Sequence, residues 1–393
     1  MKRFLLFCSF FVALGMTACG GDDELPMPPK PETPETPQEP QEPQQPGNQE
    51  PEATTDFVRG ADISWYTEMK ADGKKFYSAE GTAMECPELM RSIGMNAIRL
   101  RVWVNPERKG VGAYSNAEDV LAKAKACHAA GLNLMIDFHF SDWWADPSRQ
   151  DMPLDWQGLT QEELRTKVAD HVRSVLSAIK QAGVPVAWVQ VGNETRNGML
   201  HPTGQLWDNN GGGNFPDGWK HFTALYMAGY NSAKAVCPTA LVMPHLNTAS
   251  KVADNNWWLD EFRKAGGKMD ALALSHYPQA DGTATTPEAV NKQALLYIKQ
   301  AAKAYGVPVV VSEFGVKTQA DVTTATRLAS DFMAGCKEMG TDVCAGVFYW
   351  EPEVWSQWRP ASYTSYFDNW SAYDMGAFDA AGRPTSVLNS WAQ

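Results

Sequence analysis

The sequence lacks a surplus of positive charge, with 34 lysines and arginines against 46 aspartates and glutamates and a net charge of −12. A protein that binds nucleic acid needs a basic surface to neutralise phosphates, so we expect no nucleic-acid partner. Most of the negative charge lies in one segment, since residues 20–56 hold ten acidic residues and one lysine. The rest of the chain, residues 57–393, carries a net charge of −5.

Cysteine is scarce, and its spacing indicates neither a disulfide framework nor a zinc site. Of the seven cysteines, five lie beyond residue 56, an odd number, and none of them forms the CxxC pair of a zinc site. We predict that these five are buried free thiols. They are Cys86, Cys127, Cys237, Cys336 and Cys344.

The N-terminal segment lacks the length to span a bilayer but has the pattern of an export signal. Lys2 and Arg3 precede an apolar run from Phe4 to Gly15. The run leads into Met-Thr-Ala-Cys, which resembles a bacterial lipobox, whose cysteine is acylated and becomes the mature N-terminus. We predict a signal peptide over residues 1–18 and lipidation of Cys19. The alternative is an ordinary cleaved signal followed by an incidental cysteine.

Residues 19–56 have almost no large apolar side chains. Ten prolines lie between Leu25 and Asp56, among Glu, Gln and Thr, so the segment cannot bury enough surface to offset its ordering entropy. We predict a disordered, Pro/Glu-rich linker. The acidic run Gly20–Glu24 is similar to the surface-export signal of Bacteroides-type lipoproteins, so we expect an exported lipoprotein anchored by lipid to the outer membrane, at the cell surface.

Beyond residue 56 the sequence is that of a single α/β domain. Eight short runs rich in Val, Ile, Leu and Ala recur, and most are followed by a stretch of helical period, such as Asn116–Ala130 and Gln161–Ala182. The runs lack clean alternation, as expected for parallel strands buried on both faces. No GxGxxG follows the first run, which favours a (β/α)8 TIM barrel over a doubly wound sheet. We predict this barrel over residues 57–393, with strands at Val58–Ile63, Asn96–Val104, Leu132–Phe138, Val186–Gly192, Leu241–His245, Ala271–Ser275, Pro308–Ser312 and Ala345–Trp350.

Polar and aromatic residues gather at the ends of these predicted strands, where the catalytic residues of such a barrel lie. The residues are Asp62, Arg99, Arg101, His139, Trp144, Asn193, Glu194, His245, His276, Tyr277, Glu313, Trp350 and Glu351. Packing explains any one of them, but the same bias at all eight ends favours a functional site. Glu194 on strand four and Glu313 on strand seven face each other obliquely across the mouth, as the acid/base and nucleophile of a retaining glycosidase do.

The domain resembles glycoside hydrolase family 53, the endo-β-1,4-galactanases of a large clan of retaining barrel enzymes. The matching segments spread over nearly the whole domain and are Arg59–Ser64, Ile98–Pro106, Asp137–Pro147, Gly192–Glu194 and Phe348–Pro352. The Arg-x-Arg-Val-Trp and Ser-Asp-x-Trp-Ala-Asp-Pro runs are specific to the family, whereas Asn-Glu is shared by the whole clan. The resemblance implies endo-acting hydrolysis of β-1,4-galactan without a cofactor, and we expect a monomer.

The resemblance also implies a role for each site residue. Glu194 is expected to be the acid/base and Glu313 the nucleophile, which Arg99 keeps ionised. The substrate-binding residues implied are Asp62, Arg99, His139, Trp144, Asn193, His245, Tyr277 and Trp350. Some family members hold calcium in the loop after strand seven, but here Val316–Asp321 is short and has one acid, so we predict no metal.

Two other interpretations stay open. Another retaining barrel glycosidase, such as a β-mannanase or endoglucanase, would keep Asn193 and both glutamates, and a non-catalytic glycan-binding lipoprotein would be expected to have lost one carboxylate. Two segments, Gln205–Asp217 and the aromatic-rich Glu353–Tyr373, match no pattern and are expected to form the far ends of the cleft. The candidate sugar platforms in the second segment are Trp355, Trp358, Tyr363, Tyr366 and Trp370.

Overall fold

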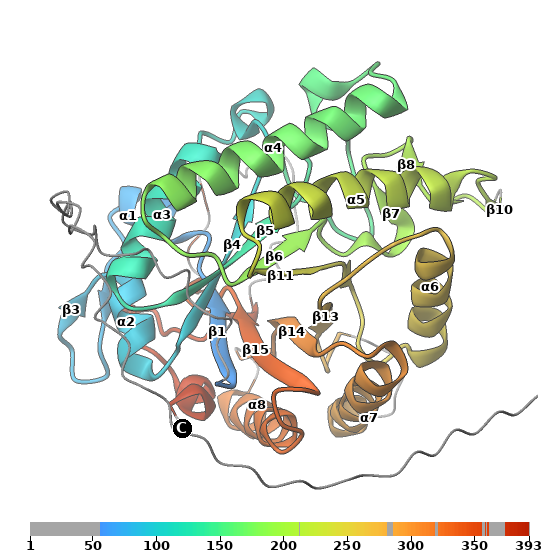
Figure 1. The fold of residues 1–393 in the computed structure, drawn as a ribbon. Coiled ribbons are helices and arrows are strands. Elements are labelled where there is room, and N and C mark those ends of the chain that lie inside the picture. The colour runs from blue at the N-terminus through green and yellow to red at the C-terminus, as the bar shows by residue number, and fades with distance from the viewer. Residues whose placement is uncertain are drawn as a thin grey trace, which may run out of the picture. The chain divides into compact units, whose positions relative to one another are not determined.

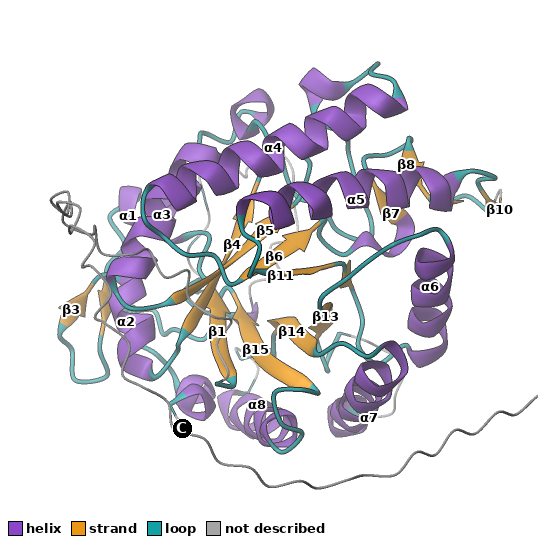
Figure 2. Ribbon diagram, viewed as in Figure 1, coloured by secondary structure: helices purple, strands orange, loops and turns teal. Residues whose placement is uncertain are grey.

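The computed structural model describes residues 56–392 except 212, 281–285, 319–320, 356–357, 359 and 361–373. The predicted signal peptide, Cys19 and the linker up to residue 55 lie outside the described residues, so those assignments stay predictions. In the described part, a ring of parallel strands is surrounded by helices (Figure 1 and Figure 2). None of the described helices combines the length and apolar character needed to cross a membrane.

The eight predicted strands are all present. They are β1 (Val58–Asp62), β4 (Ala97–Val102), β5 (Asn133–Phe138), β6 (Trp188–Val191), β11 (Leu241–Met243) with β12 (His245–Leu246), β13 (Leu272–His276), β14 (Val309–Phe314) and β15 (Cys344–Trp350). The fifth strand is divided at Pro244, and the sheet order runs from β11 through β6, β5, β4, β1, β15, β14 and β13 to β12. The sheet therefore begins and ends on the same strand, which closes the barrel.

Helices follow the strands in the order expected of βα units. They are α1 (Tyr66–Ala71), α2 (Cys86–Ile93), α3 (Ala117–Ala129), α4 (Gln161–Gln181), α5 (Gly218–Val236), α6 (Val252–Lys264), α7 (Pro287–Tyr305) and α8 (Val322–Lys337). Both α1 and α2 lie between β1 and β4, and the helix after β15 in the described residues is a 3₁₀ helix, Ser386–Trp391. It packs beside α8, and the indole of Trp391 donates a hydrogen bond to the Gly60 carbonyl at 3.0 Å.

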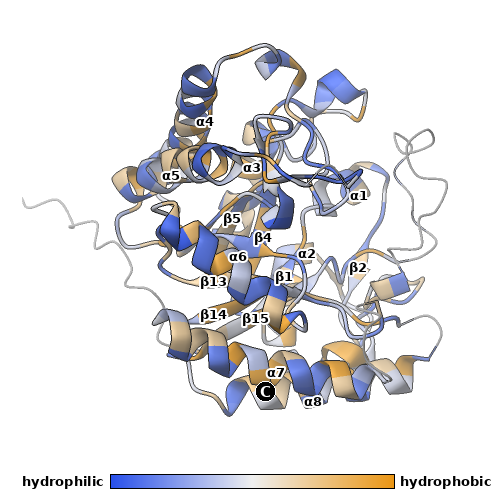
Figure 3. Cartoon of the chain, turned by 90° about the vertical axis from the view of Figure 1, so that its right-hand side faces the viewer, coloured by the Kyte–Doolittle hydropathy of each residue, from blue (hydrophilic) through white to orange (hydrophobic). Residues whose placement is uncertain are grey.

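The ends of α3 and α4 agree with the sequence prediction. The Asn116 side chain accepts a hydrogen bond from the Asp119 amide at 2.9 Å, so it caps the N-terminus of α3. Thr160 and Glu163 form a reciprocal capping box at the start of α4. Along α7 and α8, hydrophilic and hydrophobic residues alternate in patches (Figure 3), as expected for helices with one face on the barrel.

Three short antiparallel strand pairs lie in the loops between barrel strands and helices. The β2 (Phe76–Tyr77) and β3 (Ala83–Met84) pair lies between β1 and α2. The other pairs, β7 (Gly198–Met199) with β8 (Gly204–Gln205) and β9 (Trp207–Asp208) with β10 (Gly213–Asn214), lie between β6 and α5. The last two pairs follow the carboxyl end of β6, so they belong to the end of the barrel at which the strands end.

The interior of the barrel has an apolar floor beneath a polar layer. The floor is a buried cluster of Val58, Ala97, Met135, Trp188, Met243, Ala271, Ala273, Val310 and Phe348. Side chains alternate along a strand, so residues two positions further on point the same way. Two positions after a floor residue, each of five strands carries a polar residue that points into the barrel. These residues are Arg99, Asp137, Gln190, His245 and Ser275. The candidate site residues therefore stand directly on this floor.

One irregularity in β14 places Glu313 in that layer. Leu274 pairs with Val311, but the next residue of β13, Ser275, pairs with Glu313, so Ser312 is an extra residue in β14. A bulge of this kind re-aims the side chains that follow it. The predicted strand ended at Ser312, whereas the observed strand continues to Phe314 and includes the glutamate.

The five cysteines of the domain are buried free thiols, which confirms the prediction. None of them takes part in a disulfide, so the barrel is held together by packing and hydrogen bonds.

Candidate active site

Arg99 is the centre of the polar layer. Its Nη1 donates a hydrogen bond to Asp62 Oδ2 at 2.7 Å, and its Nη2 lies 2.8 Å from each of Asp137 Oδ2, Asn193 Oδ1 and Glu313 Oε1. The guanidinium is buried, and although burial acts to lower its pKa, the surrounding carboxylates raise the pKa of Arg99 above the ordinary value. One cation thus orients four acceptors that come from four strands or strand ends.

Asp62 contacts the site through Arg99. It is fully buried, its Oδ2 binds Arg99, and its Oδ1 accepts hydrogen bonds from the Ser64 amide at 2.9 Å and the Ser64 hydroxyl at 2.5 Å. Both oxygens are therefore engaged within the protein. The sequence placed Asp62 in the substrate-binding set, and in the structure it positions the arginine.

Glu194 sits at a sharp turn after β6. Its φ is 47° and its ψ 51°, a left-handed conformation that a non-glycine residue rarely adopts outside functional sites. Gly192 has a φ of 86°, and a Cβ there would lie 2.4 Å from Thr195 Cγ2, which explains the glycine in the Gly-Asn-Glu motif. The turn is held by the Gln150 side chain, which donates to the Asn193 carbonyl at 2.8 Å.

The two glutamates face each other at short range. Carboxylate oxygens of Glu194 and Glu313 lie within 4.8 Å of one another, together with a nitrogen of His245. The Ser275 hydroxyl bridges them, at 2.7 Å from Glu194 Oε1 and 3.2 Å from Glu313 Oε2. This separation fits the retaining geometry of about 5 Å and leaves no room for the water that an inverting enzyme places between its carboxyl groups.

The environments of the two carboxyl groups separate their roles. Burial raises the pKa of Glu194 well above its usual range, and the nearby charge of Glu313 raises it further. Burial also raises the pKa of Glu313, but the Arg99 cation and a hydrogen bond from the Tyr277 hydroxyl at 2.7 Å act in the opposite direction. A proton shared by the pair therefore resides on Glu194, and Glu313 is the carboxylate.

Tyr277 keeps its proton beside Glu313. Burial and the adjacent carboxylate raise the pKa of Tyr277 well above its ordinary value. The hydroxyl is therefore a hydrogen-bond donor to Glu313 throughout the working pH range of such a site.

His245 is a neutral ring that links Glu194 to Ser275. Its Nδ1 accepts a hydrogen bond from the Glu194 amide at 3.1 Å, so the proton lies on Nε2, which is 2.8 Å from the Ser275 hydroxyl. Burial lowers the pKa of His245 well below its ordinary value, in agreement with a neutral imidazole. Both ring nitrogens are occupied, so the ring has no free lone pair to offer a metal ion.

His139 is held in the same manner on the other side of Arg99. Its Nδ1 accepts from the Ala145 amide at 3.1 Å, so Nε2 carries the proton and donates to Asp137 Oδ2 at 2.9 Å. Burial opposes ionisation of Asp137, yet Arg99 and His139 hold the pKa of Asp137 below its usual value. Asn193 donates to the Ala145 carbonyl at 2.7 Å, which leaves its amide one further N–H for a ligand.

Comparison with known proteins decides the family. A model of glycosyl hydrolase family 53 matches residues 58–391, most of the chain. This chain belongs to glycosyl hydrolase family 53. It is 25% identical to an endo-β-1,4-galactanase of Bacillus subtilis over 82% of this chain and 76% of the relative. It is 28% identical to an arabinogalactan endo-β-1,4-galactanase of Thermothelomyces thermophilus over 75% and 89%.

Solved structures confirm the fold of this family 53 hydrolase. The catalytic domain of a family 53 protein from Ignisphaera aggregans superposes with a TM-score of 0.72 at 24% identity, covering 86% of this chain and 96% of that one. A fungal β-1,4-galactanase superposes with a TM-score of 0.69 at 24% identity, covering 86% and 99%. The predicted (β/α)8 barrel is thereby confirmed.

Half-buried aromatic rings of the hydrolase surround the catalytic pair. Trp350 lies at the end of β15, with its ring 5.9 Å from that of Tyr277 at an interplanar angle of 87°, and 6.5 Å from that of Trp144. These three rings are only partly covered by protein, whereas Arg99, His139 and His245 are buried beneath them. The structure thus brings the predicted site residues together. The half-buried rings face the barrel mouth, and the buried polar residues hold the catalytic pair in position.

Arg101 supports the wall formed by Trp144, a function that the predicted site set did not include. Its guanidinium carbon lies 4.3 Å from the Trp65 ring, 4.8 Å from Trp103 and 4.4 Å from Trp144, and the group forms an ion pair with Glu351. The sequence showed Arg101 and Glu351 at strand ends. The arrangement around Arg101 also needs three tryptophans, which come from separate loops. Sequence spacing carries no signal for that arrangement.

Two of the candidate sugar platforms are wrong. Trp358 is 2% exposed, its indole donates to Asp72 at 2.9 Å, and its ring packs 5.5 Å from Trp65. Trp355 is buried against Phe76 at 6.1 Å. Both are core residues because the segment after β15 folds back on α1 and β2. The remaining candidates, Tyr363, Tyr366 and Trp370, lie outside the described residues.

The single acid of the loop after β14 has a structural function. Asp321 accepts hydrogen bonds from the Thr323 amide at 2.9 Å and the Thr324 amide at 3.2 Å, so it caps the N-terminus of α8.

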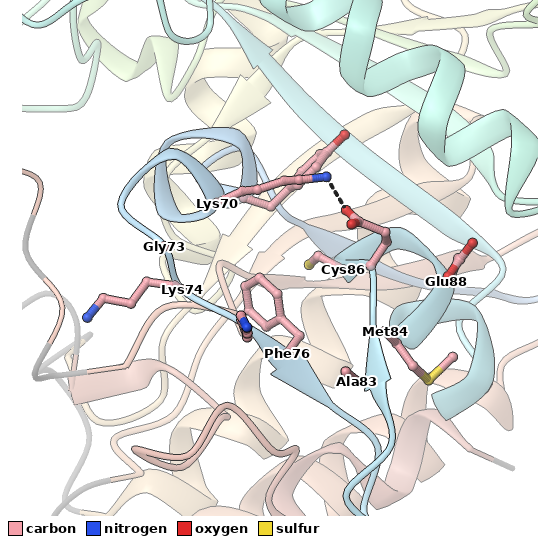
Figure 4. Close-up of a pocket in the computed structure, with 11 residues that line it drawn as sticks. Lys70, Gly73, Lys74, Phe76, Ala83, Met84, Cys86 and Glu88 are labelled. Carbon is pink, nitrogen blue, oxygen red and sulfur yellow. Dashed lines mark hydrogen bonds and ion pairs between the residues drawn. The ribbon is translucent and has the colours of Figure 1, made fainter.

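A cleft away from the catalytic pair contains none of the predicted site residues. It has a volume of about 490 Å³ and lies between α1, the β2–β3 pair and the start of α2, where Lys70, Phe76 and Met84 line it (Figure 4). Lys70 is paired with Glu85 at 2.7 Å. Of the glutamates that line this cleft, Glu85 is the one paired with Lys70, whereas the buried carboxyl pair, Glu194 and Glu313, lies at the barrel mouth.

Proposed function

We propose that this enzyme cleaves internal β-1,4-galactosidic bonds of galactan with retention of configuration. The observation that carries the proposal is the short separation of Glu194 and Glu313, within 4.8 Å, in a chain of family 53. The relatives from Bacillus subtilis and Thermothelomyces thermophilus are named as an endo-β-1,4-galactanase and an arabinogalactan endo-β-1,4-galactanase, which supports the choice of substrate.

In the first step, an oxygen of Glu313 attacks the anomeric carbon of the sugar bound over Trp350. The bond to the leaving sugar breaks, and Glu194 gives its proton to the departing oxygen. Arg99 and Tyr277 hold the Glu313 carboxylate in position by hydrogen bonds of 2.8 Å and 2.7 Å. The product of this step is a glycosyl ester on Glu313.

In the second step, Glu194 is ionised and takes a proton from water. The water oxygen bonds to the anomeric carbon, the ester bond breaks, and the Glu313 carboxylate is restored. Two inversions at one carbon give net retention. The remaining N–H of Asn193 is available to the 2-hydroxyl of the sugar in both steps.

The substrate proposal predicts selective cleavage of galactan. The purified protein is expected to release short oligosaccharides from linear β-1,4-galactan faster than from β-1,4-mannan or cellulose, because the family 53 motifs line the sugar site. Parallel digests sampled over time, with products separated by size, measure this. Faster release from mannan or glucan would indicate one of the two rival activities, and galactose as the sole early product would contradict internal cleavage.

We also propose that the enzyme is an exported, monomeric lipoprotein displayed on the outer membrane. The lipobox-like Met-Thr-Ala-Cys run and the acidic, proline-rich segment after Cys19 support this. A lipid anchor of this kind would hold the barrel near an insoluble or bulky polysaccharide.

The anchor proposal predicts a change of location without a change of activity. Cys19→Ala is expected to move the enzyme from the membrane fraction to the soluble fraction while kcat on galactan stays the same, because residue 19 precedes the domain. Cys8→Ala, a substitution in the apolar signal segment, is the matched control and is expected to leave the protein membrane-bound. Detergent partitioning measures both. Unchanged partitioning of Cys19→Ala would show that this residue is not acylated.

A further inference from the structure

Two exposed aromatic rings lie on segments that contact or follow the loop after Glu194. Trp257 on α6 is 42% exposed, and so is Phe215, in the segment that matched no sequence pattern. The Trp257 ring lies 6.0 Å from the half-buried Trp207 and 5.7 Å from the half-buried Trp219. Among the described residues, Trp257 and Phe215 are the exposed aromatic side chains.

This cluster, Trp207, Trp219 and Trp257, is tied to the turn that bears Glu194. Asn197 lies three residues after Glu194, and its side chain binds both backbone groups of Trp207. Its Oδ1 accepts a hydrogen bond from the Trp207 amide at 2.9 Å, and its Nδ2 donates one to the Trp207 carbonyl at 3.0 Å. On the α6 side, Trp258 donates to the Arg196 carbonyl at 3.0 Å.

A second link comes from an ion pair. Arg196 binds Asp254 on the first turn of α6 at 2.6 Å, and Trp257 lies one turn further along the same helix. The aromatic cluster and the acid/base turn are therefore connected through both Asn197 and Arg196, in the loop that joins β6 to α5 at the catalytic end of the barrel (Figure 1). The cluster is therefore held by direct contacts to the two residues that follow the acid/base turn, Arg196 and Asn197.

We infer that Trp257, with Trp207 beside it, is a stacking platform for galactosyl units on the leaving-group side of the scissile bond. This inference rests on the proposed galactanase activity. Glu194 protonates the departing oxygen, so the departing part of the chain must leave past the Glu194 side of the mouth, where the cluster lies. In a β-1,4-linked galactosyl unit the axial oxygen on C4 carries the glycosidic bond, and the C–H bonds of C3, C4 and C5 lie on the opposite face, which is apolar and can stack on an indole.

The charge at this surface also suits a neutral polysaccharide. Arg196 and Asp254, which link the cluster to the acid/base turn, are paired with each other, and Asp208 and Lys220, which follow Trp207 and Trp219, have opposite charges. Trp207 is also flanked by the amides of Asn197 and Asn209, which hydrogen-bond to each other at 2.9 Å. The Asn197 amide is fully used in holding this segment, whereas Asn209 is exposed, and its uncharged amide can bind a sugar hydroxyl beside the indole.

The test compares substrates that do and do not reach the platform. For Trp257→Ala we expect kcat/KM on linear β-1,4-galactan to fall about five-fold, with most of the change in KM, because stacking is lost while the carboxyl groups are untouched. On an aryl β-galactobioside, whose leaving group is a single aromatic ring, the rate is expected to stay within two-fold. Trp257→Tyr should restore most of the galactan activity. Leu296→Ala on α7, where the leucine is 60% exposed, is the matched control.

Binding without turnover provides a second measurement. In galactan-containing native gels, the inactive full-length Glu313→Gln protein is expected to be retarded more than the Glu313→Gln, Trp257→Ala double variant. Equal loss on galactan and aryl galactobioside, or equal retardation, would overturn the platform. A concentration-dependent dimer that Trp257→Ala abolishes would also overturn it, since the rings would then be an interface between copies. If wild-type protein did not cleave galactan at all, the proposed function would fail instead.

Discussion

Glu194→Gln is expected to lose galactan hydrolysis by about 10²- to 10⁴-fold yet retain the first step on an aryl β-galactobioside with a good leaving group. The leaving group of such a substrate is derived from a phenol of low pKa and departs as the phenolate without protonation, so the missing acid matters little for glycosylation. Hydrolysis of the ester then lacks its general base. The galactosyl-enzyme on Glu313 is therefore expected to accumulate, and intact-mass measurement would detect it.

Glu313→Gln is expected to behave in the opposite manner. Without a nucleophile no glycosyl ester forms, so activity should fall by at least about 10⁴-fold on every substrate, whatever its leaving group. Azide distinguishes the two variants. It needs no general base, so it should restore turnover of Glu194→Gln and yield a β-galactosyl azide with retained configuration. A β-azide from Glu313→Gln, or a covalent adduct on that variant alone, would show that the two roles are reversed.

The pKa values of Glu194 and Glu313 also predict how kcat/KM depends on pH. Burial and the charge of Glu313 raise the pKa of Glu194, so the acid stays protonated at mildly acidic to neutral pH and loses its proton as pH rises. In wild type, kcat/KM should fall at high pH as Glu194 ionises and at low pH as Glu313 is protonated. For Glu194→Gln on the aryl substrate the high-pH decline should disappear, while the low-pH decline remains.

Much of this architecture was predictable because it depends on local patterns. Eight apolar runs, buried on both faces, predicted the eight strands, and Asn116 and Thr160 mark helix starts by chemistry that sequence displays directly. Glu194 and Glu313 were recognisable because each stands at a strand end. The catalytic pairing follows from the closure of the barrel, which brings distant strand ends to one mouth.

What could not be predicted depends on contacts between distant segments. The extra residue Ser312 in β14 aims Glu313 into the mouth, but an apolar run does not reveal a bulge. Ser275 bridges both glutamates, and its sequence neighbours give no sign of this. Trp355 and Trp358 resemble exposed sugar platforms in composition, yet the chain after β15 folds them into the core. Burial of a tryptophan is decided by its neighbours in space.

Arg99→Met is expected to destabilise the protein by about 3–5 kcal/mol, the cost of leaving buried charges without their partner. Three carboxylates, those of Asp62, Asp137 and Glu313, lose their shared cation at 2.7–2.8 Å. Chemical denaturation at neutral pH, monitored by tryptophan fluorescence, measures the loss. Arg108→Met is the matched control: Arg108 pairs with Asp155 at 3.1 Å with both side chains about half exposed, so its loss should cost less than about 1 kcal/mol.

The pH dependence of this loss tests its electrostatic origin. Arg99 and His139 hold the pKa of Asp137 below its unfolded value, so the ionised Asp137 adds stability above that unfolded value, and the addition disappears as pH falls through the folded pKa. Arg99→Met removes the main cation responsible, so the stability difference between wild type and variant should persist from pH 7 down to about 4, the unfolded pKa of an aspartate, and narrow as the pH is lowered further. A difference that stays constant with pH would assign the loss to packing of the arginine stem, and a variant within about 1 kcal/mol of wild type at neutral pH would contradict the view that one buried cation organises the site.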